Sequence, residues 1–360
     1  MGNILLRGYF GHGNWGDEIL LRALVRGFGK NGFPKERFHY WRGRDRSFQP
    51  AAIGHSIPRG IKGIAAWASA SAMVFCGGIF YDHLPDFKIR RLQHIFLMVR
   101  ISRLLGKKIV MLGVSIGPLV TPEGRRLTRK ILELAHIIRV RDRLSHDFCR
   151  KAGLNCRQMP DLSAILLPDI PLADKALGNG EILFIPCASG MGYQTHVKIL
   201  NALTAVARRY RFRIRLMPIH MNVDTELAHR LADQMGFQMA PALSADPMDL
   251  FNRLKDAELI VSARLHGGWA AYLLGRPLLQ IDHHTKCRGF AETIGLPGKC
   301  LIDPFVETVD LEAGARLWFE AGDDLSGDFT SRRALEKQAM LALADVAQNL
   351  RAGQKPMDTR

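Results

Sequence analysis

The chain has 360 residues, of which 47% are hydrophobic and 23% are charged, so a disordered chain is excluded and about two globular domains are expected. The net charge is +16, and its excess lies in the first half: residues 1–160 hold 28 basic and 10 acidic residues, whereas residues 161–360 hold 22 and 24. Such asymmetry suits acidic glycans or an anionic membrane surface, or serves solubility alone. Nucleic acid is disfavoured, because no platform of interleaved aromatic and basic residues accompanies the charge.

The start of the chain, Met1-Gly2-Asn3-Ile4-Leu5-Leu6, lacks the basic and long apolar regions of a secretory signal. Six cysteines are scattered without a CxxC pair or zinc-like spacing, which favours reduced thiols and disfavours a metal site. Residues 61–80 contain Lys62 and a Gly-Gly pair, so we interpret them as a helix and a short strand rather than a membrane span. We therefore expect a cytoplasmic protein with no metal.

Short apolar runs alternate with helical stretches, a pattern typical of βαβ units and parallel sheets. The expected strands are, in the first half, Ile4–Leu6, Met73–Cys76, Ile109–Gly113 and Ile137–Val140, and in the second half, Ile182–Pro186, Ile214–Pro218, Leu259–Val261 and Pro277–Ile281. We predict an α/β fold of two Rossmann-like domains that face a cleft. The domains span residues 1–170 and 178–325 with a linker near 167–180, and a helix at 330–350 could pack back on the first domain.

The first candidate site element is the glycine-rich stretch from Gly8 to Glu18, between the first strand and a helix expected at Ile19–Phe28. Ligands of parallel sheets bind at the carboxyl ends of the strands, and a helix start offers unpaired N–H groups to an anion. We therefore take Asn14, Gly16 and Asp17 as candidate substrate-binding residues. The glycine spacing does not give a clean dinucleotide fingerprint, and the alternative role for Asp17 is that of a helix cap.

Three further elements follow expected strands of the first half. Gly77 and Gly78 come just after Met73–Cys76 and allow a ligand or the other domain to approach closely, unless they form an ordinary turn. Ser115 lies in the glycine-rich turn GVSIGP after Ile109–Gly113. Arg141 follows Ile137–Val140; we expect it to enter the cleft while Asp142 caps the next helix, the alternative being a surface arginine.

The strongest candidate for catalysis is Ser262-Ala263-Arg264-Leu265-His266-Gly267-Gly268, directly after Leu259–Val261. In an extended chain Arg264 and His266 would point to the same side, before a helix at Trp269–Gly275. An arginine fork and a helix start can hold a phosphate together, and a histidine exchanges protons near neutral pH. A purely structural histidine is the alternative.

The last element is Asp282–Phe290, after the strand Pro277–Ile281. Lys286 would lie beside Arg264 and His266 if the two strands are neighbours in the sheet. The adjacent His283 and His284 would point in opposite directions in an extended chain, which argues against a metal site.

Taken in order, these elements resemble the polysaccharide pyruvyltransferase family. The resemblance runs from Gly8 to about Gly295 and rests on the following segments: GYFGHGNWGDE, the Gly77-Gly78 pair, GVSIGP, Arg141-Asp142 with Ser145, PDLSA at 160–164, and SARLHGGWAAYLLGRPLLQIDHHTK. This sequence differs from the usual family pattern in having Cys76 and Ile79 where a third glycine is common.

The resemblance implies a GT-B-like fold with the acceptor on the first domain, and transfer of pyruvate from phosphoenolpyruvate to two sugar hydroxyls. The products would be a cyclic ketal, in an exopolysaccharide or its lipid-linked precursor, and phosphate. Carried over, His266 and Arg264 are the catalytic candidates, with Lys286 and Arg141 as further basic residues of the active centre. A general acid that protonates the enol methylene fits His266, and no step requires a metal or redox cofactor.

The segment Lys88–Lys108 mixes seven arginines and lysines with a run of apolar residues. It could rest on the anionic inner face of a membrane and meet a lipid-linked saccharide, or be a half-buried helix beside a strand. Two other functions remain open on the sequence: a GT-B nucleotide-sugar glycosyltransferase, and a non-catalytic membrane-associated assembly protein.

Overall fold

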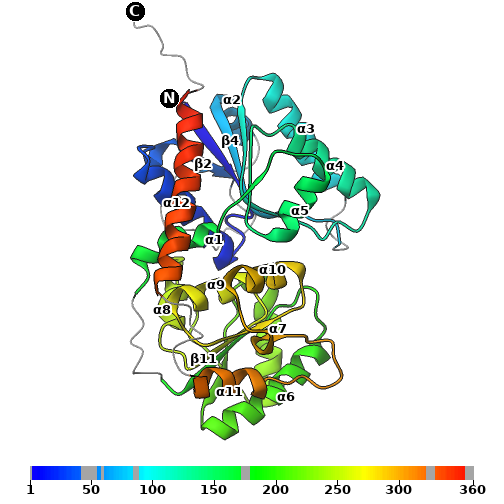
Figure 1. Cartoon of the computed structure of the whole chain (residues 1–360), viewed down its shortest axis with the longest axis vertical. Coiled ribbons are helices and arrows are strands. Elements are labelled where there is room, and N and C mark those ends of the chain that lie inside the picture. The colour runs from blue at the N-terminus through cyan, green and yellow to red at the C-terminus, as the bar shows by residue number, and fades with distance from the viewer. Residues whose placement is uncertain are drawn as a thin grey trace, which may run out of the picture.

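The computed structural model describes residues 2–41, 55–57, 61–83, 89–171, 179–321 and 329–352. Within them the chain forms two parallel β-sheets, each covered by helices, one above the other in Figure 1. We call residues 2–171 the N-terminal unit and residues 179–321 the C-terminal unit. Lys88, residues 172–178 of the expected linker and residues 322–325 of the expected second domain lie outside the described part of the chain.

The N-terminal unit is built on a parallel sheet whose strands lie in the following spatial order: β3 (His55–Ile57), β2 (Phe38–Trp41), β1 (Asn3–Arg7), β4 (Ala70–Phe80), β5 (Lys108–Ile116), β6 (Ile137–Val140) and β7 (Arg157–Gln158). Its helices are α1 (Trp15–Lys30), η1 (Lys35–Arg37), α2 (Ile61–Ser69), α3 (Arg90–Leu104), α4 (Pro122–Glu133), α5 (Arg143–Lys151) and η2 (Leu162–Asp169).

The C-terminal unit has a second parallel sheet, in the order β10 (Gln238–Met239), β9 (Arg213–Leu216), β8 (Glu181–Ile185), β11 (Leu259–Ser262), β12 (Leu278–Ile281) and β13 (Leu301–Ile302). Its helices are α6 (Tyr193–Tyr210), α7 (Met221–Met235), α8 (Asp249–Leu254), α9 (Leu265–Leu274), α10 (Thr285–Ile294), η3 (Gly298–Cys300) and α11 (Glu312–Ala321). Renumbered within each unit, the first six strands of both sheets have the doubly wound order 3-2-1-4-5-6, so the predicted pair of Rossmann-like units is confirmed.

Alternating side chains of the strands pack into two hydrophobic cores, one on each face of the first sheet. Ile4 and Leu6 of β1 join the core beneath α1 and η2, whereas Leu5 joins the core beneath α3 and α4. Strands buried on both faces read as continuous apolar runs, which is why the sequence reveals them.

The last helix, α12 (Phe329–Ala352), runs along the N-terminal unit in Figure 1. Asp345 forms an ion pair with Arg139 of β6, and Leu343 packs against Gly27 of α1. Arg332, near the other end of the helix, donates to the carbonyl of Leu273 in α9 at 3.2 Å. The helix therefore contacts both units and packs chiefly on the first.

Two elements differ from their expected bounds in ways that matter for the site. β4 continues through Gly77 and Gly78 to Phe80; its register against β5 shifts on both sides of Gly77, whose φ is +75°, so the glycines form an irregularity within the strand rather than a turn after it. β5 likewise extends to Ile116, which places Ser115 inside the strand.

Helix α1 begins at Trp15, four residues before the expected start at Ile19. Asn14 is its N-cap and accepts a hydrogen bond from the backbone N–H of Gly16 at 3.2 Å. Asp17 therefore lies in the first turn and is not the cap, a position in which the helix dipole favours a carboxylate.

Candidate active site

The carboxyl ends of the two sheets face each other where the units meet. In each sheet the strand order reverses between its first and fourth strand, which is where ligands of such sheets bind. Helix α1 follows β1, the first strand of the first sheet, and α9 follows β11, the fourth strand of the second sheet. The glycine-rich loop after β1 is held to the other unit by backbone hydrogen bonds: Met221 N–H donates to Gly13 at 2.8 Å, and Trp15 N–H donates to Ile219 at 3.0 Å.

His266 lies at this junction, in the first turn of α9, and is 9% exposed. A Cβ on Gly16 would lie 2.2 Å from its Nδ1, so only glycine allows α1 of the opposite unit to approach the imidazole this closely. On its other side, Nε2 lies 3.3 Å from Nη1 of Arg141 and 3.7 Å from a carboxylate oxygen of Asp161. The histidine thus bridges the two units.

The expectation that Arg264 and His266 share one side of an extended chain is wrong, because α9 starts at Leu265 and Arg264 is its N-cap residue. The early start follows from the glycine pair. A Cβ on Gly267 would lie 2.4 Å from Oγ of Ser262, and one on Gly268 would lie 2.2 Å from Oε1 of Gln280. These glycines serve close packing of the helix on its sheet rather than a turn before it.

Arg141 is buried in a polar network at the ends of β5, β6 and β7. Its Nε donates to Oγ of Ser115 and its Nη1 donates to Asp161, both at 2.7 Å. Ser115 in turn donates to Asp142, which caps α5 as predicted by accepting from the N–H of Ser145. Arg141 is therefore buried at the junction and is not a surface arginine.

Asp161 is fully buried and provides the negative charge of this network. Burial alone would raise the pKa of its carboxyl, but the Arg141 guanidinium and the nearby His266 imidazole outweigh it and hold the pKa well below its usual range. The carboxylate stays ionised and can orient both Arg141 and His266.

Arg264 is held by a carboxylate of its own unit. Its Nε and Nη2 donate to the two oxygens of Asp224 at 2.8 and 2.5 Å, and Asp224 also accepts from the N–H of Ala188 at 3.0 Å. The planar fork is thus occupied on one side, and the rest of the guanidinium, 17% exposed as a side chain, adds positive charge to the junction.

Lys286, in the first turn of α10, reaches across to β4. A Cβ on Gly78 would lie 2.3 Å from its Nζ, and the ammonium sits 5.1 Å from the centre of the Tyr81 ring. Within the described part of the chain, Nζ donates no hydrogen bond to a protein acceptor. Burial, reinforced by the charge of Arg141, lowers the pKa of Lys286 to about 8 despite the opposing Asp17.

Asp17 is a further buried carboxyl at the same junction. Nδ2 of Asn14 donates to its Oδ2 at 2.5 Å, and a Cβ on Gly77 would lie 3.3 Å from its Oδ1. Burial raises the pKa of Asp17, although His266, Arg141 and Lys286 act in the opposite direction. A carboxyl poised in this way can exchange a proton in a reaction.

All the sequence-predicted site residues thus lie at or beside one junction, although the glycines contribute only by their small size. His284 accepts from the N–H of Lys286 and caps α10, so it acts structurally. Among the residues that the structure describes, no group of three or more histidine, cysteine, aspartate or glutamate side chains could hold a metal ion.

Sequence reasoning missed three residues of the junction. Asp161 belongs to a segment of the family resemblance, but no partner could be predicted for it; its position after the last strand of the first sheet is the signal that could have revealed it. Asp224 lies 40 residues before the arginine it pairs with, and Tyr81 follows β4 as an ordinary aromatic residue. Neither has a local pattern that reveals its role.

Comparisons with known proteins agree with this geometry. The family model described as polysaccharide pyruvyl transferase matches residues 14–285, a range that contains every predicted site residue except Lys286, one position beyond its end. No curated protein sequence matches the chain.

Solved structures show the fold. A UDP-GlcNAc 2-epimerase of Methanocaldococcus jannaschii, in complex with UDP-GlcNAc and UDP, has a TM-score of 0.57 at 11% identity and covers 93% of this chain and 97% of its own. A glycosyltransferase of Rickettsia africae has a TM-score of 0.55 at 10% identity, over 100% of both chains. The wall teichoic acid polymerase TagF has a TM-score of 0.53 at 12% identity, over 97% of this chain and 89% of its own.

The two facing doubly wound units are therefore GT-B-like, as predicted. The family match covers well over half of the chain and includes both the first turn of α1 and the Arg264–His266 element. The chain belongs to the polysaccharide pyruvyl transferase family.

Proposed function

We propose that the protein transfers the pyruvyl group of phosphoenolpyruvate to two hydroxyls of a sugar in a cell-surface polysaccharide or its lipid-linked precursor. The products are a cyclic ketal and inorganic phosphate. The family membership supports polysaccharide pyruvylation in general, and the observation that carries the donor assignment is the Lys286 ammonium, which lies beside Arg141 and His266 without a hydrogen-bond acceptor in the described protein.

Phosphoenolpyruvate brings a carboxylate and a phosphate, and both need cations. Lys286 is a point charge that a phosphate or carboxylate oxygen can approach, while the exposed part of Arg264 offers a further donor. Because burial costs the Lys286 ammonium much of its stability, a bound anion would recover that free energy. Asp161 already holds the Arg141 side chain in place, so the ligand does not have to order it on binding.

The reaction delivers two protons, one to the enol methylene and one to the departing phosphate, and removes two, one from each sugar hydroxyl. His266 gives a proton to the enol methylene, which becomes the ketal methyl group and leaves C2 electrophilic. One sugar hydroxyl adds to C2 and loses its proton, phosphate departs with its bridging oxygen, and the second hydroxyl closes the ring. The two hydroxyl protons balance those gained by the methyl group and the phosphate. The imidazole can take back the first, and Asp17, with its raised pKa, is suited to receive the second.

A product-release assay tests this proposal. The protein is incubated with saccharide acceptors and either phosphoenolpyruvate or a nucleotide sugar, and released phosphate and nucleoside diphosphate are measured. We expect acceptor-dependent phosphate from phosphoenolpyruvate, with the KM for that donor raised in Lys286→Met and unchanged in the surface control Lys299→Met. Nucleoside diphosphate released from a nucleotide sugar, with none of the expected phosphate, would instead identify a glycosyltransferase.

We further propose that the protein works in the cytoplasm at the inner face of a membrane, where a lipid-linked acceptor is presented. None of the described helices is long and apolar enough to cross a bilayer. α3 carries Arg90, Arg91, Arg100 and Arg103 and no acidic residue, which suits an anionic surface. Co-sedimentation with anionic vesicles at low salt tests this: binding that salt weakens is expected, and no binding at low salt would end the idea.

A further inference from the structure

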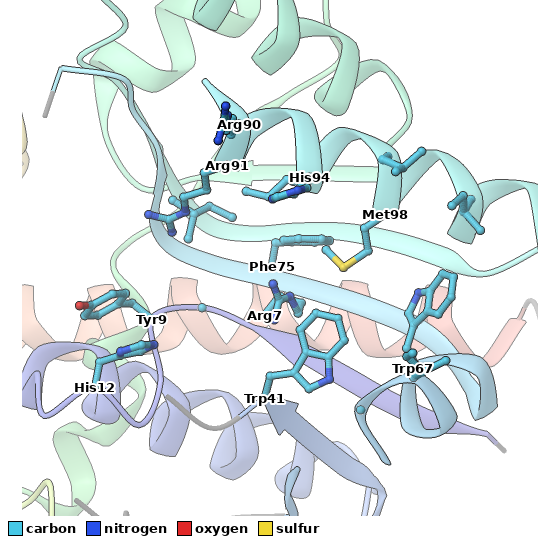
Figure 2. Close-up of a pocket in the computed structure, with 17 residues that line it drawn as sticks. Arg7, Tyr9, His12, Trp41, Trp67, Phe75, Arg90, Arg91, His94 and Met98 are labelled. Atoms are coloured by element: carbon cyan, nitrogen blue, oxygen red, sulfur yellow. The ribbon is translucent and has the colours of Figure 1, made fainter. Parts of the chain in front are cut away.

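A groove of about 870 Å³ opens in the N-terminal unit, between the edges of β1, β2 and β4 on one side and helices α2 and α3 on the other (Figure 2). It is separate from the His266 cluster. Groove-lining residues of α3 extend from Arg90 to Ile101, so at 1.5 Å per residue the groove follows the helix for roughly 16 Å. A single sugar would not fill that length.

The groove changes character along its length. One end is polar and is lined by Tyr9, His12 and Arg91, whereas the other end is lined by Trp67, Met98 and further apolar side chains (Figure 2). Arg7 lies between these ends, with its guanidinium 3.9 Å from the centre of the Trp41 ring. Basic side chains are thus combined with a long apolar wall, and none of the lining residues that the structure describes is acidic.

The sequence of α3 produces this gradient. Arg91, His94, Met98 and Ile101 recur at intervals of three or four residues and so lie on one face of the helix. The basic members lie in the first turns and the apolar members in the later turns. A ligand with an anionic group at one end and an alkyl chain at the other would therefore meet the basic side chains with its anionic group and the apolar side chains with its alkyl chain.

The polar end of the groove adjoins the candidate active site. Nη1 of Arg91 donates to the Tyr81 hydroxyl at 3.1 Å, and the ring of Tyr81 lies 5.1 Å from Nζ of Lys286. Tyr9 stacks on His12 and meets the ring of His220 edge-on at 5.7 Å. A ligand at the polar end would thus lie one side chain away from the proposed donor site.

The apolar end is surrounded by exposed hydrophobic side chains. Of the ten large hydrophobic residues exposed in the described chain, five lie on or just after α2 and α3: Ile61, Ile64, Leu97, Leu104 and Leu105. Concentrated apolar surface of this kind marks a contact with an apolar partner.

We propose that this groove binds the lipid part of a lipid-linked glycan: the alkyl chain lies along Trp67, Met98 and Ile64, the phosphate lies near Arg91, and the sugar extends past Tyr81 toward Lys286. The proposal rests on the proposed function, whose acceptor it narrows to a saccharide carried on a long-chain alkyl phosphate. The bilayer itself is the less suitable occupant, because the apolar wall is a groove between elements and not only a raised face.

The tryptophans allow a direct binding experiment. Trp41 and Trp67 line the groove and are partly exposed, whereas the other three tryptophans, Trp15, Trp269 and Trp318, are buried. The probe is a decyl phosphate with two bromine atoms on its chain, used below its micelle concentration, since bromine quenches indole fluorescence on contact. We expect saturable quenching that unbrominated decyl phosphate reverses and inorganic phosphate does not.

A matched pair of variants locates the binding. Ile64 lines the groove and is 61% exposed, and Val120 is 60% exposed outside it, so Ile64→Glu and Val120→Glu make similar changes to the surface. A carboxylate in the groove should weaken probe binding by about tenfold or more, because the alkyl chain would desolvate it and the phosphate would repel it. Val120→Glu should bind as the parent protein does. Melting curves establish that both variants are folded.

Three results would overturn the proposal: quenching that does not saturate, equal binding by Ile64→Glu and Val120→Glu, or competition by phosphatidylglycerol vesicles as effective as that by decyl phosphate. The last would identify a membrane-contact surface. Because binding is measured without phosphoenolpyruvate, its outcome is independent of pyruvyl transfer. Intact binding in a protein that releases no phosphate with any acceptor would reject the proposed function and leave the class of lipid ligand standing.

Discussion

The pKa of Lys286, lowered to about 8 by burial and by Arg141, predicts a limit on donor binding at alkaline pH. If the ammonium holds phosphoenolpyruvate, kcat/KM for this donor should fall about tenfold for each pH unit above 8, because at pH 9 only about one tenth of the free protein keeps the charge. In Lys286→Arg the guanidinium stays protonated, so this alkaline limb should disappear.

The assay is phosphate release from phosphoenolpyruvate at limiting donor concentration between pH 6.5 and 9.5. Lys299→Arg, an exposed lysine of the same unit, should keep the parent profile. Lys286→Met is a second variant for the case in which the larger guanidinium does not fit over Gly78. Because methionine carries no charge, this variant should show low kcat/KM at every pH and no alkaline limb near pH 8. An unchanged alkaline limb in both Lys286 variants would refute the reasoning.

The same pKa predicts a change in stability. The folded protein releases the Lys286 proton at about pH 8 and the unfolded chain near 10.5, so between these values the unfolded chain binds more protons and the free energy of unfolding rises with pH. The rise from this one group is about 3 kcal/mol. Urea unfolding of Lys286→Met, compared with the parent across this range, should lack that increment.

Two further substitutions test the packing of the junction. Gly16→Ala places a methyl group within 2.2 Å of Nδ1 of His266, so kcat should fall at least about a hundredfold. Gly29→Ala in the same helix, with open space around it, should keep full activity; equal activities in the two variants would contradict the close approach. Asp161→Asn leaves a buried guanidinium without its countercharge and should cost about 3–5 kcal/mol in urea unfolding, against at most about 1 kcal/mol for Asp147→Asn, whose ion pairs are exposed. A loss below 1 kcal/mol in Asp161→Asn would show that the pair is not needed.

The sequence predicted the architecture well because strands buried on both faces carry a simple signal. Ile4–Leu6 and Leu259–Val261 are continuous apolar runs, and both lie in strands of the structure. The site was predictable to the extent that its residues follow such strands, because doubly wound sheets gather the carboxyl ends of their strands. Arg141, His266 and Lys286 meet for this reason.

The ends of strands and helices were less predictable at glycines, because a glycine can mark a turn, a strand irregularity or a close contact within a helix. The sequence predicts Gly77 just after a strand that ends at Cys76, yet it forms an irregularity within β4. It predicts Gly267 before a helix that begins at Trp269, yet Gly267 belongs to the helix. In each case the deciding factor is a tertiary contact, such as the side chain of Ser262 against Gly267, that local sequence does not contain. The pairing of Asp224 with Arg264 was hidden for the same reason.

The most direct test of the account is proton NMR of saccharide acceptors, both free and lipid-linked, incubated with phosphoenolpyruvate and the protein. Transfer of pyruvate to two hydroxyls must create a new ketal methyl signal, and in the proposed reaction His266 delivers the proton that completes this methyl group. We predict that this signal appears with the parent protein, is lost in His266→Ala, and persists in the control Gly29→Ala. A ketal methyl signal of undiminished rate in His266→Ala, or none with any acceptor, would contradict the account.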